Sequence, residues 1–151
     1  PHIKLGCAGK IITGFDMARA HALGADWCNV ARGFMFAVGC IQAQTCHTGH
    51  CPTGVTTQDP KRQRAIVVTD KLERVCNFHR ETVKSLAEML AAVGMTSPSE
   101  LKPHHICRRV GDGRILTFAD QFQFLAPGQL LKSKAKHAYS DAWALASAER
   151  F

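Results

Sequence analysis

The stretch HIKLGCAGKIITGFDMARAHALGADWCNVARG, residues 2–33, decides the fold class. Residues 2–9 and 25–33 are short apolar runs that finish on small residues, a pattern that predicts strands. Residues 15–24 between them predict a helix, because apolar residues recur at a 3.6-residue period and Gly24 supplies a stop. Two strands joined by one helix form a βαβ unit, which requires parallel strands and a right-handed crossover. The sequence therefore predicts an α/β fold.

The composition is that of a folded domain. The chain has 151 residues, of which 46% are hydrophobic and 21% charged. No apolar run reaches the roughly 20 residues that a transmembrane helix needs, so we predict no membrane association. The chain opens without a secretory leader. Because it starts at Pro1 directly in a strand-like run, we expect it to be part of a longer polypeptide.

The formal net charge of +7 raises the question of nucleic-acid binding. The positive residues are scattered, apart from one short cluster at 132–137, and aromatic residues do not alternate with them. Nucleic-acid-binding surfaces usually gather such charges on one face and add aromatic stacking platforms. We therefore predict no nucleic-acid partner. The basic groups are expected to face anionic cofactors, metabolites or acidic protein surfaces.

A second stretch, CIQAQTCHTGHCP at residues 40–52, places three thiols at the spacing C-x5-C-x4-C. It lies in a segment from residue 39 to 60 whose Thr, Gly and Pro content predicts a loop. The chain has seven cysteines. Without an export signal they indicate a reducing, cytoplasmic location, where thiols bind metals or act in catalysis. The four cysteines outside this loop lie singly in apolar surroundings and are predicted to be buried: Cys7, Cys28, Cys76 and Cys107.

Two kinds of metal site are compatible with the three thiols. An iron–sulfur cluster needs thiolates that converge from an irregular loop, and Pro52 directly follows the last thiol, as in many cluster loops. A structural zinc site would take its fourth ligand from His47 or His50, although the usual zinc spacing between cysteines is shorter. The residues alone favour the cluster and leave zinc open.

The ends of the two predicted strands carry small and basic residues, Cys7-Ala8-Gly9-Lys10 and Ala31-Arg32-Gly33. In parallel barrels and doubly wound sheets, backbone N–H groups at the carboxyl ends of strands bind phosphates. Gly9 permits close backbone approach, and Lys10 and Arg32 could add positive charge. A phosphate-binding edge and ordinary tight turns explain these residues equally well.

Residues 69–94 predict one long helix, with Thr69 or Asp70 as its N-cap and Gly94 as its stop. Residues 97–101 predict a short capped turn. The sequence leaves the structure beyond them undefined. One face of the long helix is expected to be buried: Leu72, Val75, Cys76, His79, Val83, Leu86, Leu90 and Val93.

The segment GKIITGFDMARAHALGADWCNVARGFMFAVGCIQAQTCHTGHCPTGVTTQDP resembles the closing part of the synthase domain of glutamate synthases, especially FMN-binding glutamate synthase-like proteins. The likeness covers about residues 2–95 and is most specific at C-x5-C-x4-C-P-x-G-V-x-T-Q-D-P. In that family three cysteines hold a [3Fe-4S] cluster beside FMN in a (β/α)8 barrel. The resemblance therefore implies the following sites: cluster ligands at Cys40, Cys46 and Cys51, and an FMN phosphate near Gly9, Lys10, Ala31 and Arg32.

The resemblance also implies the domain organisation. Residues 1–95 would be the C-terminal portion of a TIM barrel, its last two strands, with the cluster loop at 39–60 and a long closing helix. Residues 96–151 would be a C-terminal extension. A full barrel needs about 250 residues. The implied partners are therefore the remaining barrel and glutaminase portions, in the same protein or in a companion subunit.

Enzymes of this family form L-glutamate from 2-oxoglutarate and glutamine-derived ammonia. Their electrons come from NAD(P)H through a flavoprotein subunit, or from ferredoxin. The resemblance implies the same oxidoreductase class here, with catalytic residues that this chain does not identify. The alternative is a non-catalytic iron–sulfur or zinc module that serves electron transfer or protein interaction.

Overall fold

The computed structural model describes residues 3–132 and 137–149. The chain divides into two compact units, Pro1–Lys102 and Pro103–Phe151. The described elements are both helices and strands, which confirms the predicted α/β class. Among the described residues, no helix combines the length and the hydrophobicity needed to cross a bilayer.

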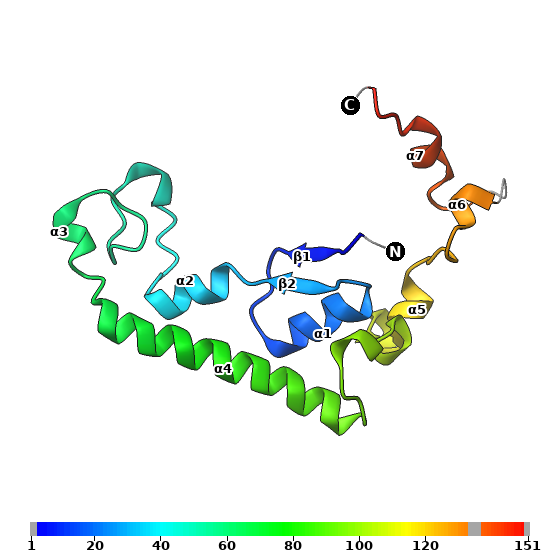
Figure 1. Ribbon diagram of the computed structural model, residues 1–151, viewed down its shortest axis with the longest axis horizontal. Coiled ribbons are helices and arrows are strands. Elements are labelled where there is room, and N and C mark those ends of the chain that lie inside the picture. Colours follow the sequence, from blue (N-terminus) through cyan, green and yellow to red (C-terminus); the bar gives the residue numbers. More distant parts are fainter. Residues whose placement is uncertain (1–2, 133–136, 150–151) are drawn as a thin grey trace. The chain divides into compact units, whose positions relative to one another are not determined.

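The first unit begins with the predicted βαβ unit (Figure 1). The strands β1 (Gly6–Ala8) and β2 (Trp27–Asn29) pair in parallel along their whole length, and α1 (Gly14–Ala22) connects them. Both strands are shorter than predicted. β1 ends at Ala8 because Gly9 and Lys10 adopt left-handed backbone angles, with φ of +97° and +56°, which no strand accommodates.

Local sequence signals explain both ends of α1. The Thr13 hydroxyl accepts a hydrogen bond from the Asp16 N–H at 3.2 Å, and the Asp16 carboxylate accepts one from the Thr13 N–H at 3.0 Å. This reciprocal pair is a capping box. Burial alone would raise the pKa of Asp16, but the hydrogen bonds from Thr13 and Ile12 lower it. Gly24, at a φ of +109°, lies just beyond the helix C-cap, as predicted.

A helix that the sequence analysis did not predict, α2 (Arg32–Val38), directly follows β2. Its sequence, RGFMFAV, is nearly uniformly apolar and has no side-chain N-cap, so neither periodicity nor capping marks it. It ends at Gly39, at a φ of +121°. The predicted loop follows. It is irregular except for a 3₁₀ turn at Cys46–Thr48 and the short α3 (Pro60–Gln63).

The predicted long helix is α4 (Val68–Ala92), which lies along α1 and α2 (Figure 1). Gly94 follows its end at a φ of +74°, as expected. The predicted N-cap is wrong. The helix begins at Val68, after an N-cap at Val67 that has no side-chain hydrogen bond, so Thr69 and Asp70 lie inside the first turn.

The buried face of α4 differs in part from the predicted one. Leu86 and Leu90 are buried, each 6% exposed, as predicted. Leu72, Val83 and Val93 are exposed, at 63%, 44% and 62%. A neighbouring stripe of the helix, which includes Phe78, faces α2.

Phe78 of α4 packs on α2. Its ring lies edge-on to the Phe34 ring, with centroids 5.0 Å apart. Gly33 allows this approach, because a Cβ atom there would lie 2.4 Å from the Phe78 ring. The packing of α4 on the unpredicted α2 therefore differs from the predicted face, and Leu72 stays exposed.

A 3₁₀ turn at Pro98–Glu100 closes the described elements of the first unit and confirms the predicted capped turn, with a capping box between Ser97 and Glu100. In its described residues, the second unit contains an antiparallel strand pair, short α-helices and 3₁₀ turns. Phe118 and Ile106 are its buried apolar residues, 7% and 6% exposed. Its elements are β3 (Cys107–Arg109), β4 (Ile115–Thr117), α5 (Phe118–Gln121), α6 (Gln129–Lys132) and α7 (Ser140–Leu145).

Candidate functional site

The residues expected near a phosphate follow the carboxyl ends of β1 and β2, at one edge of the small parallel sheet. Because β1 and β2 are parallel and Ala8 lies opposite Asn29, the segments that follow them start from the same side of the sheet. Gly9 and Lys10 form the left-handed turn after β1. Ala31 is the N-cap of α2. The turn needs a glycine for its backbone angle and not for space, because a Cβ at Gly9 would meet no atom within 4 Å.

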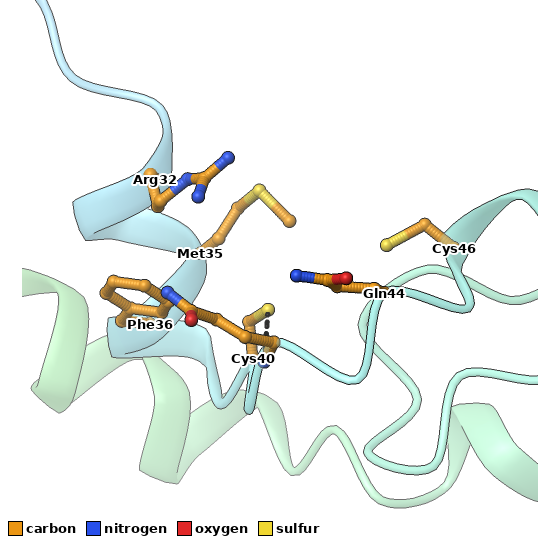
Figure 2. A pocket seen from close by; sticks show the side chains of 7 residues that line it. Arg32, Met35, Phe36, Cys40, Gln44 and Cys46 are labelled. Carbon is orange, nitrogen blue, oxygen red and sulfur yellow. Dashed lines mark hydrogen bonds between the residues drawn. The ribbon is translucent and has the colours of Figure 1, made fainter. Parts of the chain in front are cut away.

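Arg32, the first residue of α2, connects this edge to the cysteine loop. Its side chain lines a pocket of about 290 Å³ together with Cys40 and Cys46. Figure 2 shows both sulfur atoms facing this opening, the Gln44 amide extending between them, and Arg32 reaching in from α2. The complete lining is Arg32, Met35, Phe36, Cys40, Gln42, Gln44 and Cys46.

The backbone between the first two cysteines is folded into an unusual shape. Gln42 and Gln44 both have a φ of +57°, in the left-handed region that few residues other than glycine adopt. The Gln42 N–H donates a hydrogen bond to the Cys40 sulfur at 3.4 Å (Figure 2). Such turns direct backbone N–H groups toward anions and recur at iron–sulfur sites. This loop therefore supplies Cys40 with a backbone donor.

Cys51 lies outside that pocket and is only 8% exposed. Its sulfur lies 3.5 Å from the Thr53 hydroxyl oxygen. The pKa of the Cys51 thiol is lowered to about 6, first by the Thr53 hydroxyl and next by the Thr56 N–H, against the opposing effect of burial. At neutral pH this thiol is mostly ionised, and the thiolate is the form that binds metals.

The loop around Cys51 is tied to its surroundings. The Thr57 hydroxyl donates to the Gly49 carbonyl, and the Gln63 side-chain amide donates to the Thr57 carbonyl at 2.9 Å. Gly54, at a φ of +78°, lies so close to α3 that a Cβ there would be 2.3 Å from the Arg62 carbonyl oxygen. These contacts fix the chain on the carboxyl side of Cys51.

The three thiols of the loop are not gathered at one point. Within residues 3–132 and 137–149, no three His, Cys, Asp or Glu side chains are arranged as a metal site. The chemistry of the donor set nevertheless fits an iron–sulfur group. Cys40 has a backbone donor, Cys51 ionises readily, and the buried Thr56 hydroxyl has no hydrogen-bond partner in the described part of the chain. The assignment of the three cysteines as cluster ligands stays a prediction.

The other cysteines differ partly from expectation. Cys7 and Cys28 are half-buried and lie opposite each other across β1 and β2. Burial, and then the neighbouring Cys7, raises the pKa of Cys28. Cys76 and Cys107 are exposed, so the prediction that they are buried is wrong. Cys76 is an exposed residue of α4, and Cys107 begins β3, whose three residues are all exposed.

Sequence reasoning did not single out several residues of this region. Met35 and Phe36 belong to the helix that it missed, and Gln42 and Gln44 carry no motif. Thr53 and Thr56 were detectable in part, because the sequence PTGVTT after Cys51 is unusually rich in hydroxyl groups. What the sequence does not reveal is which of these hydroxyl groups points at the sulfur.

We compared the chain with families and sequences of known proteins. Residues 1–96 match the conserved region in glutamate synthase. The chain is 46% identical to the glutamate synthase large subunit-like protein YerD of Bacillus subtilis over 114 residues. The aligned region is 76% of this chain and 22% of that protein. The chain is 33% identical to the glutamate synthase [NADPH] large chain of Azospirillum brasilense over 99 residues. The aligned region is 66% of this chain and 6% of that protein.

An archaeal glutamate synthase [NADPH] of Archaeoglobus fulgidus is 33% identical over 95 residues, which are 63% of this chain and 19% of that protein. The chain thus spans less than a quarter of the length of these relatives. The match over residues 1–96 includes the βαβ unit and the cysteine loop. The chain belongs to the glutamate synthase family.

Proposed function

We propose that this chain is the cofactor-binding part of a glutamate synthase-like flavin and iron–sulfur oxidoreductase. The observation that carries the proposal is the pocket that Cys40, Cys46 and Arg32 line together, with both sulfur atoms facing its opening (Figure 2). Family membership supports the reaction class, and the pocket supports a cofactor role for this segment.

In this proposal Cys40, Cys46 and Cys51 bind a [3Fe-4S] cluster, which passes single electrons when bound. A three-iron cluster takes one thiolate per iron, so three cysteines are a complete ligand set. The Gln42 N–H stabilises negative charge on the Cys40 sulfur, and the low pKa of Cys51 provides a thiolate at neutral pH. His47 and His50 are exposed and outside the pocket, and we assign them no metal role.

The FMN phosphate would bind where β1 and β2 end, near Gly9, Lys10, Ala31 and Arg32. All four residues are exposed at one sheet edge, and two of them are basic. Phosphates commonly bind at such edges in α/β proteins. Arg32 belongs both to this edge and to the pocket of Cys40 and Cys46, so the two cofactors would have one side chain in common.

The reaction of the whole protein would be formation of L-glutamate from 2-oxoglutarate and glutamine-derived ammonia. A bound flavin would provide the hydride chemistry, and residues of the protein would position it and set its potential. The electron donor would be NAD(P)H through a flavoprotein subunit, or ferredoxin. The substrate sites would lie in the rest of the enzyme.

The small size of the two-stranded sheet is an argument for additional barrel strands beside it. Parallel sheets normally have both faces covered and more than two strands. Here β1 and β2 pair only with each other among the described residues. Trp27 lies over Gly6 and remains 46% exposed. We propose that the remaining strands of a (β/α)8 barrel continue this sheet, from the same protein or from a companion subunit.

This proposal predicts that the chain alone binds FMN weakly and forms no glutamate. Contacts to the phosphate would leave the flavin ring solvated and free to rotate, so affinity and orientation would both be poor. The experiment is to titrate FMN into the chain and then to assay 2-oxoglutarate, ammonia and a chemical reductant. The protein with the rest of its barrel should bind FMN tightly and form glutamate. Tight binding with glutamate formation by the chain alone would show that the active site lies in these residues.

A further inference from the structure

Two threonine hydroxyl groups belong to the short segment that follows Cys51. The Thr53 hydroxyl oxygen is 3.5 Å from the Cys51 sulfur, and the Thr56 hydroxyl is buried a few residues further along the chain. Cys51 is nearly buried at 8% exposure, so water provides little competition for these donors. The Cys51 surroundings thus differ from those of Cys46, which is exposed and opens onto the pocket.

The Thr56 hydroxyl is poised to donate but has no ordinary acceptor. Its oxygen is buried and makes no hydrogen bond of normal geometry within the described residues. A buried hydroxyl without a partner is unfavourable, since it loses its bonds to water and gains none. A neutral thiol is a weak acceptor, whereas a sulfur with negative charge accepts more strongly. A charged Cys51 sulfur would therefore satisfy this group.

The loop holds both threonines in place. The Gly54 N–H donates to the Cys51 carbonyl at 3.4 Å, which turns the chain directly after Thr53. Gly54 packs against the Arg62 carbonyl of α3. The Thr57 hydroxyl is bonded to the Gly49 carbonyl. These contacts anchor the segment on both sides of Thr56.

Other threonines of the loop make a different kind of contact. The Thr48 hydroxyl donates to the Thr45 carbonyl at 2.8 Å and accepts from the His50 N–H. The Thr57 hydroxyl also donates to a backbone carbonyl. Hydroxyl groups that already donate to the backbone have no proton left for a sulfur. The geometry therefore distinguishes Thr53 and Thr56 from their neighbours.

We propose that Thr53 and Thr56 are positioning residues that donate hydrogen bonds to the Cys51 sulfur when it binds the iron–sulfur group, and that they raise its reduction potential. The inference rests on the proposed three-cysteine site. Reduction adds negative charge to the group, and donors to a ligand sulfur stabilise that charge. Removal of either hydroxyl group should make the group harder to reduce.

The test uses Thr53→Val, Thr56→Val and the double variant, which remove the hydroxyl groups and keep the branched shape. Thr48→Val is the matched control, because its hydroxyl bonds to backbone instead of sulfur. Each protein is purified anaerobically, its iron and sulfide are measured, and its reduction potential is determined by a titration followed by paramagnetic resonance. We expect each single variant to have a more negative potential, the double variant the most negative, and Thr48→Val the wild-type value.

The outcomes separate this inference from the proposed function. Wild-type protein without iron and sulfide would overturn the three-cysteine site, and this inference with it. Wild-type potentials in cluster-containing valine variants would overturn the inference alone. If the valine variants lose iron, Thr53→Ser and Thr56→Ser restore the hydroxyl groups. Recovery of iron and of the wild-type potential then supports hydrogen bonding, and failure to recover them overturns it.

Discussion

Replacing Cys46 with serine is expected to abolish the visible absorbance of the cluster and its paramagnetic signal in the oxidised state. A three-iron cluster has one protein thiolate for each iron, so loss of one cysteine leaves an iron without its ligand. Serine does not substitute, because its hydroxyl is a harder ligand and stays protonated at neutral pH. Cys46 is exposed beside the pocket and has no role in the packed core.

Cys76→Ser is the matched control for that experiment. Cys76 is also exposed, but it lies on α4, outside the cysteine loop. Its replacement should leave absorbance, iron content and the paramagnetic signal unchanged. Unaltered spectra in Cys46→Ser would remove Cys46 from the ligand set and with it the three-cysteine assignment.

The second large effect is expected at Leu86. Leu86→Ala should lower the free energy of unfolding by about 2–5 kcal/mol, as truncations of buried leucines do. Leu86 is 6% exposed and lies where α4 meets α1. The helices are in close contact there, because a Cβ on Gly14 would be 2.8 Å from the Leu86 nitrogen. Little room exists for the surroundings to collapse into the space that the side chain leaves.

Leu72→Ala provides the comparison on the same helix. Leu72 was expected on the same buried face but is 63% exposed, so its truncation should change stability by less than about 0.5 kcal/mol. Urea unfolding followed by circular dichroism measures both variants. Equal losses at the two positions would mean that the described orientation of α4 is wrong.

The sequence predicted those parts of the fold that depend on local patterns. The βαβ unit follows from two apolar runs, a helix of 3.6-residue period and the stop at Gly24. The start of the long helix was less predictable than its end at Gly94, since its N-cap, Val67, makes no side-chain bond. The short α2 was missed because a helix of seven mostly apolar residues has no polar face to reveal its period.

Tertiary contacts account for the remaining differences. The rotation of α4 depends on Phe78 meeting Phe34 beside Gly33, a contact between segments far apart in the sequence. A hydrophobic period could not choose between two adjacent stripes of one helix, because both carry apolar residues. Leu72 was therefore assigned to the core although it is 63% exposed.

The candidate site also combines features that the sequence predicts with features that only the tertiary structure reveals. The spacing of Cys40, Cys46 and Cys51 predicted a metal site, and that assignment stays a prediction. The pocket shared by two of these thiols depends on α2, which sequence reasoning did not find. The two threonines around Cys51 depend on a turn at Gly54. Spacing identifies candidate ligands, whereas the donors that tune them come from backbone geometry.

The most direct test of this account is the metal and sulfide content of the anaerobically purified protein, measured together with its visible absorption. The account predicts iron and acid-labile sulfide in the proportion of a [3Fe-4S] cluster, with broad visible absorption that disappears in Cys46→Ser. A colourless protein that contains zinc and no sulfide would contradict it and would favour a zinc module, with His47 or His50 as the candidate fourth ligand.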